Sequence, residues 1–340
     1  MSNKLDFNIG VVGAGYFAQL HHQAWEKLAT AQLVGVADPN RDATSACDVP
    51  RYDSLADMLA DDTINVIDIV VPPDAHRAVI EEAIAGGISY IICQKPFCGS
   101  KKDAQEMVEL AKAKGVSLVV HENFRFQPWY RALQSELATE RFGQIYQFCF
   151  SLRPGDGQGA DAYLERQPYF QTMPRFLVHE TAVHFLDIFT FLFGRPRAIY
   201  ADLRRLNPVI AGEDAGLIIC DYDNEMRAIF DGNRLADHKA HNQRLTMGEA
   251  TLESQNGTMR LIGDGSLLWR AKGALEDDVI FRCDSQDIFG GDCVYHLIAH
   301  VIDAWKNGTT PENEAASYLD IIALEEMVYH SADGGYKIQL

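Results

Sequence analysis

The sequence has few positive charges for its length. Lys and Arg number 30 against 48 Asp and Glu in 340 residues, which gives a formal net charge of −18. A surface of this sign repels the phosphate backbone of nucleic acids and the head groups of anionic lipids. We therefore expect neither nucleic acid nor a membrane among the partners of this protein.

Cysteine pairs with metal-binding or redox spacing are also missing. The seven cysteines are odd in number and none of them forms a C-x-x-C pair, so they indicate reduced thiols rather than a disulfide framework or a zinc site. No apolar run is long enough to span a membrane, and the first residues lack the apolar core of a signal peptide. These absences predict a cytoplasmic protein with no bound metal.

The first third of the chain alternates short apolar, β-branched runs with amphipathic helical patterns. This alternation predicts an α/β fold, a doubly wound parallel sheet with helices on both faces, over residues 1–122. The expected strands are 7–12, 32–37, 66–71, 90–93 and 117–121, and the expected helices are 16–28, 54–60, 75–85 and 101–113.

The pattern changes after residue 122. Strand-like runs between 198 and 282, separated by turn signals such as Asn256-Gly257, predict a largely antiparallel sheet, and helical patterns at 292–306 and 313–330 end the chain. Residues 123–340 are therefore expected to form an α+β domain. Within it, residues 153–175 fit no regular pattern, and we interpret them either as a lid or binding loop or as a disordered surface insertion.

A glycine motif directly follows the first expected strand. Gly13, Gly15 and Ala18 fit the pattern G-x-G-x-x-[GA], in which the glycines allow a tight turn and a close approach to a pyrophosphate at a helix N-terminus. The motif predicts a dinucleotide site whose first contacts are Gly13, Ala14, Gly15, Tyr16 and Phe17.

An acidic residue ends the second expected strand. Asp38 lies 23 residues after Gly15, where a carboxylate accepts hydrogen bonds from the ribose hydroxyls and repels a 2′-phosphate. This position predicts NAD rather than NADP as the cofactor. Arg41 is close enough in sequence to offset that charge, and it is the next cofactor-binding candidate.

Two more segments follow expected strands of the parallel sheet. Pro72 and His76 come after the strand at 66–71, and Gln94 and Lys95 come after the strand at 90–93. Ligands of open parallel sheets bind at the carboxyl ends of the strands, so these residues are further cofactor-binding candidates. Lys95 is also a candidate cation of the reaction site.

The stretch that begins at Arg175 has the pattern of a helix. Glu180, His184 and Asp187 have i, i+4, i+7 spacing and form a polar stripe beside an aromatic face, which we expect to line a cleft. His179 and His184 lie five residues apart, about 140° around a regular helix at about 100° per residue. We therefore expect no metal shared by these two histidines.

Taken together, these motifs resemble the glucose-fructose oxidoreductase / inositol dehydrogenase (Gfo/Idh/MocA) family. The resemblance implies NAD-dependent oxidation of a sugar or polyol hydroxyl, with Lys95 and His184 as the catalytic pair. Within the family, the chain is similar to aldose dehydrogenases that make lactones. The segments that carry the resemblance are the glycine motif, Asp38-Pro39, Pro72-Pro73-Asp74-x-His76, Gln94-Lys95-Pro96, Asn123-Phe124-Arg125-Phe126 and Glu180 to Asp187.

Two residues depart from the family pattern. Gln94 stands where family members usually carry glutamate, and Glu180 stands where aspartate is usual, one methylene shorter. The second change alters the geometry expected of the substrate pocket. The substrate contacts that the resemblance implies are Glu180, Asn123, Arg125, Asp187 and Arg175.

His184 is the expected base because imidazole titrates near neutral pH, and Lys95 would stabilise negative charge on the reacting oxygen. Two alternatives are a reductase of a keto sugar or of another carbonyl or imine, and a non-catalytic NAD(H) sensor, which would need neither side chain.

The resemblance also implies an open sheet after Ala198 that serves in oligomer contacts. We expect a homo-oligomer, a dimer or a tetramer, because Leu217, Ile219 and Ile229 would otherwise expose apolar surface.

Overall fold

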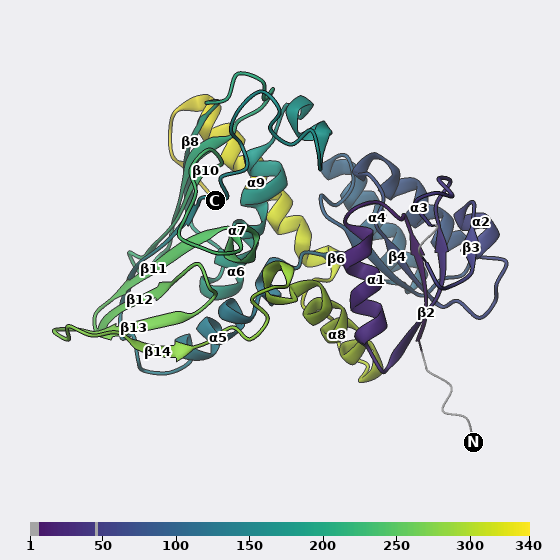
Figure 1. Ribbon diagram of the computed structural model, residues 1–340, viewed down its shortest axis with the longest axis horizontal. Helices are drawn as coiled ribbons and strands as arrows, with labels where there is room; N and C mark the ends of the chain where they lie inside the picture. The colour runs from purple at the N-terminus through teal and green to yellow at the C-terminus, as the bar shows by residue number, and fades with distance from the viewer. Residues whose placement is uncertain (1–6, 45–46) are drawn as a thin grey trace. The chain divides into compact units, whose positions relative to one another are not determined.

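The computed structural model describes residues 7–44 and 47–340 (Figure 1). The first six residues, in which no signal peptide is expected, lie outside the described part. The chain divides into two compact units, Met1–Asn123 with Val294–Ile322 and Phe124–Cys293 with Ala323–Leu340. The first division lies beside the boundary expected after residue 122. The segment Val294–Ile322 also belongs to the first unit, whereas the sequence pattern placed it in the second domain.

The first unit contains six parallel strands in the order β3-β2-β1-β4-β5-β6. The predicted doubly wound parallel sheet is confirmed. Strand order reverses between β1 and β4, and this reversal creates the crevice at the carboxyl edge where such sheets bind ligands. The strands are β1 (Phe7–Val12), β2 (Ala31–Ala37), β3 (Arg51–Tyr52), β4 (Val66–Ile69), β5 (Tyr90–Gln94) and β6 (Ser117–His121).

Capping residues set the ends of the helices in this unit. The hydroxyls of Ser54 and Ser100 accept hydrogen bonds from backbone amides at the starts of α2 and α4, and Gly115, with φ of +68°, ends α4. In the described part of the chain, no helix is both long and apolar enough to cross a membrane. The helices are α1 (Ala18–Lys27), α2 (Leu55–Met58), α3 (Pro73–Ala85), α4 (Lys101–Lys114), α8 (Cys293–Lys306) and the first part of α9 (Ala315–Gly334), whose remainder belongs to the second unit.

The second unit is built on a nine-stranded sheet in the order β14-β13-β12-β11-β7-β10-β9-β8-β15. Only the β7–β10 pair is parallel among its described strands, so the predicted open, mostly antiparallel sheet is confirmed. The strands are β7 (Ile145–Leu152), β8 (Ala198–Arg204), β9 (Ala215–Asp221), β10 (Arg227–Asn233), β11 (Gly248–Ser254), β12 (Gly257–Leu261), β13 (Leu267–Ala271), β14 (Asp278–Phe281) and β15 (Ile338–Gln339).

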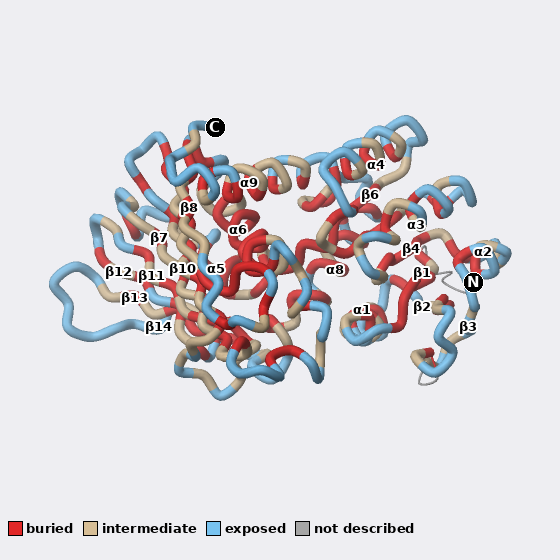
Figure 2. The backbone as a smooth tube through the Cα atoms, turned by 90° about the horizontal axis from the view of Figure 1, so that it is seen from above, coloured by how far each residue is buried: buried red, intermediate tan, exposed pale blue. Residues whose placement is uncertain are grey.

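One face of this sheet packs on α6. Alternate residues of β7 point to this face, and the rings of Phe148 and Phe150 lie 5.8 and 4.0 Å from those of Phe189 and Phe185. Figure 2 shows α6 as buried backbone, as it does β1 and β4 of the other unit. The helices of the second unit are α5 (Pro128–Leu137), α6 (Val183–Phe193) and α7 (Gln243–Thr246), with 3-10 turns at Phe124–Phe126, Pro168–Thr172 and Phe289–Gly291.

The prediction of a regular helix from Arg175 is wrong for the first residues of that segment. Residues Leu177–Ala182 form a π-helical turn, η3, and α6 begins only at Val183. The Glu213 carboxylate accepts hydrogen bonds from the backbone amides of Phe176 and Val178, each at 3.1 Å, and so fixes this entry from outside the helix. Glu180 therefore precedes the α-helix that carries His184 and Asp187, and the three do not form one α-helical stripe.

Residues 153–175 have a defined, packed course. They include the 3-10 turn Pro168–Thr172, and they supply Ala162, Tyr163 and Phe170 to a small core that Phe176 and Ile210 complete. Beyond this core, a bridge joins Pro154 to Asp237. This packing contradicts the interpretation as a disordered insertion.

Candidate active site

The glycine loop between β1 and α1 leaves room for a pyrophosphate. Gly13 has φ of +108°, and a Cβ there would lie 2.2 Å from the Val70 carbonyl oxygen, so a side chain is excluded. A Cβ on Gly15 would meet nothing within 4 Å, which is the open approach that a bound phosphate needs. Tyr16 is 46% exposed, and Phe17 contacts the edge of His21 at the start of α1.

Asp38 braces the glycine loop from the end of β2. Its Oδ2 accepts a hydrogen bond from the Ala14 amide and its Oδ1 accepts one from the Asn40 amide, each at 2.8 Å. These bonds orient the carboxylate, and each oxygen has a second lone pair for a ribose hydroxyl. The loop and this carboxylate together fit a dinucleotide with a free 2′-hydroxyl.

Arg41 forms an ion pair with Asp53. The guanidinium donates two hydrogen bonds to the Asp53 carboxylate, which raise the pKa of Arg41 and lower that of Asp53. Both residues line a cavity of about 460 Å³ together with Asp38 and Arg51. Sequence reasoning missed Arg51 and Asp53 because β3, the strand beside them, is only two residues long.

Pro72 and His76 shape the loop after β4. Pro72 is the N-cap of α3, and the His76 ring is fully buried with Nε2 2.9 Å from the Val71 carbonyl oxygen. Burial lowers the pKa of His76 below its usual value of 6.5. This placement favours a role for His76 in holding the loop that the cofactor would contact.

Gln94 lies in a buried hydrogen-bond network beneath Lys95. Its Oε1 accepts the Lys95 backbone amide at 2.9 Å, so its amino group faces His21 Nε2 at 2.9 Å and His121 Nδ1 at 3.2 Å. A backbone N–H can only donate, and this fixes which end of the Gln94 amide faces the histidines. The Gln94 amide thus anchors the backbone of Lys95.

The network continues from His21 to the centre of the sheet. His21 Nδ1 and Trp25 Nε1 both donate to Asp68 Oδ2 at 2.7 Å, and all three side chains are buried. Sequence reasoning did not include His21, His121 or Asp68 in the site. The available signal was Asp68, a charged residue inside the otherwise apolar strand β4.

His184 lies in the second unit, on the first turn of α6. Its side chain is buried, and its ring stacks on Phe124 with centroids 3.8 Å apart and an interplanar angle of 6°. The stacking fixes the orientation of the imidazole. His179 instead places Nδ1 2.6 Å from Glu325 Oε1, so the two histidines contact different partners.

Arg125 and Asp187 form an ion pair beside His184. The guanidinium donates to both oxygens of the buried Asp187 carboxylate, with Nε 2.8 Å from Oδ2. A two-point bond of this kind is rigid, which favours a positioning role for both side chains. Asn123, the last residue of the first unit before the division, is buried.

Arg175 is directed toward α9. It bonds to Glu326 at 2.6 Å, and its guanidinium lies 4.2 Å from the centre of the Tyr329 ring. Its role in substrate binding stays a prediction.

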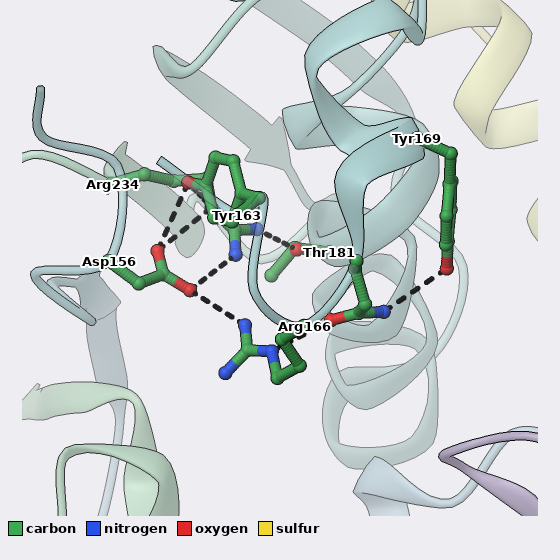
Figure 3. Close-up of polar contacts among 7 residues, drawn as sticks. Asp156, Tyr163, Arg166, Tyr169, Thr181 and Arg234 are labelled. Carbon is green, nitrogen blue, oxygen red and sulfur yellow. Dashed lines mark hydrogen bonds and ion pairs between the residues drawn. The ribbon is translucent and has the colours of Figure 1, made fainter. Parts of the chain in front are cut away.

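Glu180 lies half-buried in the π-helical turn, next to a polar cluster that the sequence did not reveal. Thr181, the following residue, accepts a hydrogen bond from Arg234, which also bonds to Asp156 and Tyr163 (Figure 3). Arg234 follows β10 and looks in sequence like an exposed charge at a strand end, yet it is 2% exposed.

Comparison with known proteins identifies both parts of the chain. Residues 7–122 match the family described as "Oxidoreductase family, NAD-binding Rossmann fold", and residues 130–253 match the "GFO/IDH/MocA C-terminal domain". Two curated relatives are called D-apiose dehydrogenase. The protein from Paraburkholderia graminis is 29% identical over 98% of this chain and 90% of its own length, and that from Rhizobium rhizogenes is 28% identical over 99% of both.

Solved structures include a similar chain of about the same length. An oxidoreductase from Agrobacterium radiobacter, in complex with NAD+, L-tartaric acid and magnesium, has a TM-score of 0.86 and 26% identity over 98% of both chains. The shared architecture thus extends over both units of the chain.

Proposed function

Because the chain belongs to the GFO/IDH/MocA family of oxidoreductases, with an NAD-binding Rossmann fold at its N-terminus, we propose that it is an NAD-dependent dehydrogenase of a sugar or polyol hydroxyl. The observation that carries the proposal is the similarity to D-apiose dehydrogenases over nearly the whole chain. We propose an aldose as the substrate, oxidised at its anomeric carbon to a lactone. The non-catalytic sensor is set aside, because the chain is an oxidoreductase.

A substrate screen tests this function. Purified protein with NAD+ is mixed with D-apiose, other aldoses, ketoses and inositols, and the absorbance of NADH is followed. We expect NAD+ to be reduced fastest when the substrate is an aldose. Turnover only of keto sugars with NADH would favour the reductase instead, and inertness toward every compound in both directions would contradict the proposal.

We assign the proton chemistry to His184 and Lys95. Bound NAD supplies the hydride acceptor, the C4 carbon of its nicotinamide. His184 takes the proton from the substrate hydroxyl while the adjacent C–H bond gives up its hydride, so that the carbinol becomes a carbonyl. The Lys95 ammonium donates a hydrogen bond to the same substrate oxygen and stabilises the negative charge that develops there.

The remaining candidates hold the substrate and the base. The Glu180 carboxylate accepts hydrogen bonds from other sugar hydroxyls. The ion pair of Arg125 with Asp187 stabilises α6, the helix that carries His184. The Phe124 ring keeps the imidazole in one plane. Asn123 and Arg175 complete the proposed substrate contacts.

We predict that NAD is preferred over NADP by at least about tenfold in kcat/KM. The Asp38 carboxylate would lie against a 2′-phosphate, and Arg41 is neutralised by Asp53, so repulsion is not offset. Steady-state kinetics with the two cofactors and one substrate measure the ratio.

A variant at Asp53 provides the control for this preference. Asp53→Asn leaves Asp38 in place but removes the negative charge that pairs with Arg41. It should lower the ratio of kcat/KM with NAD to kcat/KM with NADP. An equal or reversed preference in the unmodified protein would mean that Arg41 or Arg51 governs the pocket.

We also propose that the protein is a homo-oligomer, a dimer or a tetramer, in the cytoplasm. Across four neighbouring strands, Tyr200, Ile219, Ile229 and Cys149 are successive partners and form a half-buried row on the face of the sheet opposite Phe148 and Phe150. Light scattering should give a multiple of 37.9 kDa. A mass of one chain throughout the micromolar range would contradict this proposal, as would an unchanged oligomer after Ile219→Lys.

A further inference from the structure

Arg234 is an unusual residue in the second unit. Its guanidinium is almost completely buried and lies among three aromatic rings, 5.2 Å from the centre of Tyr163, 5.7 Å from Phe170 and 4.7 Å from Phe176. A buried cation is costly unless charge and hydrogen bonds compensate it. The groups that bond to Arg234 therefore show how its charge is compensated and which segments it joins.

The guanidinium bonds to two separate parts of the chain (Figure 3). On one side, Nη2 donates to Asp156 at 2.9 Å and Nε donates to the Tyr163 hydroxyl at 2.8 Å, both within residues 153–175. On the other side, Nη1 donates to Thr181 Oγ1 at 2.7 Å, within the π-helical turn. Burial lowers the pKa of Arg234, but Asp156 and Tyr163 raise it by more, so the guanidinium stays charged.

The segment 153–175 is thereby joined to the residue that follows Glu180. The same segment carries Tyr169, whose side chain is half exposed and whose hydroxyl accepts a hydrogen bond from Gln167 at 3.1 Å. Burial raises the pKa of Tyr169, and the charge of Glu180 raises it further.

We propose that Arg234 is a positioning residue of the substrate site, and that it holds the π-helical turn through Thr181 so that Glu180, the preceding residue, keeps the orientation in which it binds the substrate. The proposal rests on the proposed function, in which Glu180 contacts the sugar. The bonds to Asp156 and Tyr163 and the surrounding aromatic rings fix the guanidinium, so Thr181 bonds to a donor that is itself held in place.

Two conservative substitutions separate positioning from stability. Thr181→Val removes the bond from Arg234 to the residue that follows Glu180. Tyr163→Phe, the control, removes a bond of similar length to the same guanidinium and the bond from the Tyr163 hydroxyl to Asp156, but it leaves the bond to Thr181 in place. We expect Thr181→Val to raise KM for the aldose roughly three- to tenfold with kcat and KM for NAD little changed. Each variant loses buried hydrogen bonding, so both should lower the Tm to a similar extent. Tyr163→Phe should nevertheless leave KM for the aldose within about twofold of the value for the unmodified protein. Equal increases in KM would overturn the positioning role.

Hydrogen–deuterium exchange tests the anchor without any substrate. Thr181→Val should accelerate exchange of the amides of residues 177–182, whereas Tyr163→Phe should not. If the unmodified protein turned over no sugar, the proposed function would fail, and this comparison would still decide whether Arg234 orders the turn. Equal exchange rates in both variants would overturn the anchor.

Discussion

Replacing His184 by alanine is expected to lower kcat by roughly 10²–10⁴-fold, the usual contribution of a general acid–base group. The imidazole is buried and stacked on Phe124, so its loss removes a group already held in one orientation. The affinity for NAD, measured by calorimetry, should stay nearly unchanged, since the glycine loop and Asp38 belong to the other unit.

The control for this substitution is His330→Ala, an exposed histidine on α9 of the same unit, which should retain full turnover. Lys95→Met should resemble His184→Ala. If both side chains act on one oxygen, the double variant should be far less than multiplicatively impaired. Near-normal turnover by His184→Ala would mean that the base lies elsewhere, and Glu180 would be the next residue to test.

Replacing Asp156 by alanine is expected to lower the free energy of unfolding by about 3–5 kcal/mol. The change leaves the Arg234 guanidinium buried without its carboxylate, and an uncompensated buried charge is among the most destabilising defects in a protein. Urea titrations followed by circular dichroism measure the loss. The matched control is Asp277→Ala, which breaks the more exposed pair with Arg260 and should cost about 1 kcal/mol or less.

Acid should reduce the contribution of Asp156. Burial raises the pKa of this carboxyl, but Arg234, Arg166 and Tyr163 together lower it by more, and the net pKa lies below the ordinary 3.8. The unfolded chain therefore binds the proton first, so the stabilisation is complete above about pH 4 and is lost as the pH falls through the lower folded pKa. The stability difference between the unmodified protein and Asp156→Asn should shrink on acidification. A difference that is constant with pH would contradict this assignment.

The parts of the fold that sequence predicted best are those governed by local pattern. The strands and helices of the first unit follow from apolar periodicity and from caps such as Ser100, which act within a few residues. The strand β3 was missed because two residues carry no periodicity, and β15 was missed because it exists only through pairing with β8.

The site was predicted unevenly for a related reason. Gly13, Asp38 and Lys95 occupy positions that a parallel sheet brings to one edge, so their spacing predicted their neighbourhood. The π-helical turn at Glu180 depends on Glu213, a residue 33 positions away whose carboxylate holds the preceding amides. No periodicity within the turn itself indicates such a contact.

The sequence by itself determined the class of fold and the glycine loop with its acidic partner, and it supplied the candidate groups for proton transfer. These features depend on local chemistry, namely backbone freedom at glycine, apolar periodicity and the titration of imidazole. Only the tertiary structure decided that Gln94, whose amino group faces His21 and His121, anchors the Lys95 backbone, and that Arg234 is buried between residues 153–175 and Thr181. Burial and hydrogen bonding between distant segments set both arrangements, because a polar side chain removed from water takes whichever partners the completed fold provides.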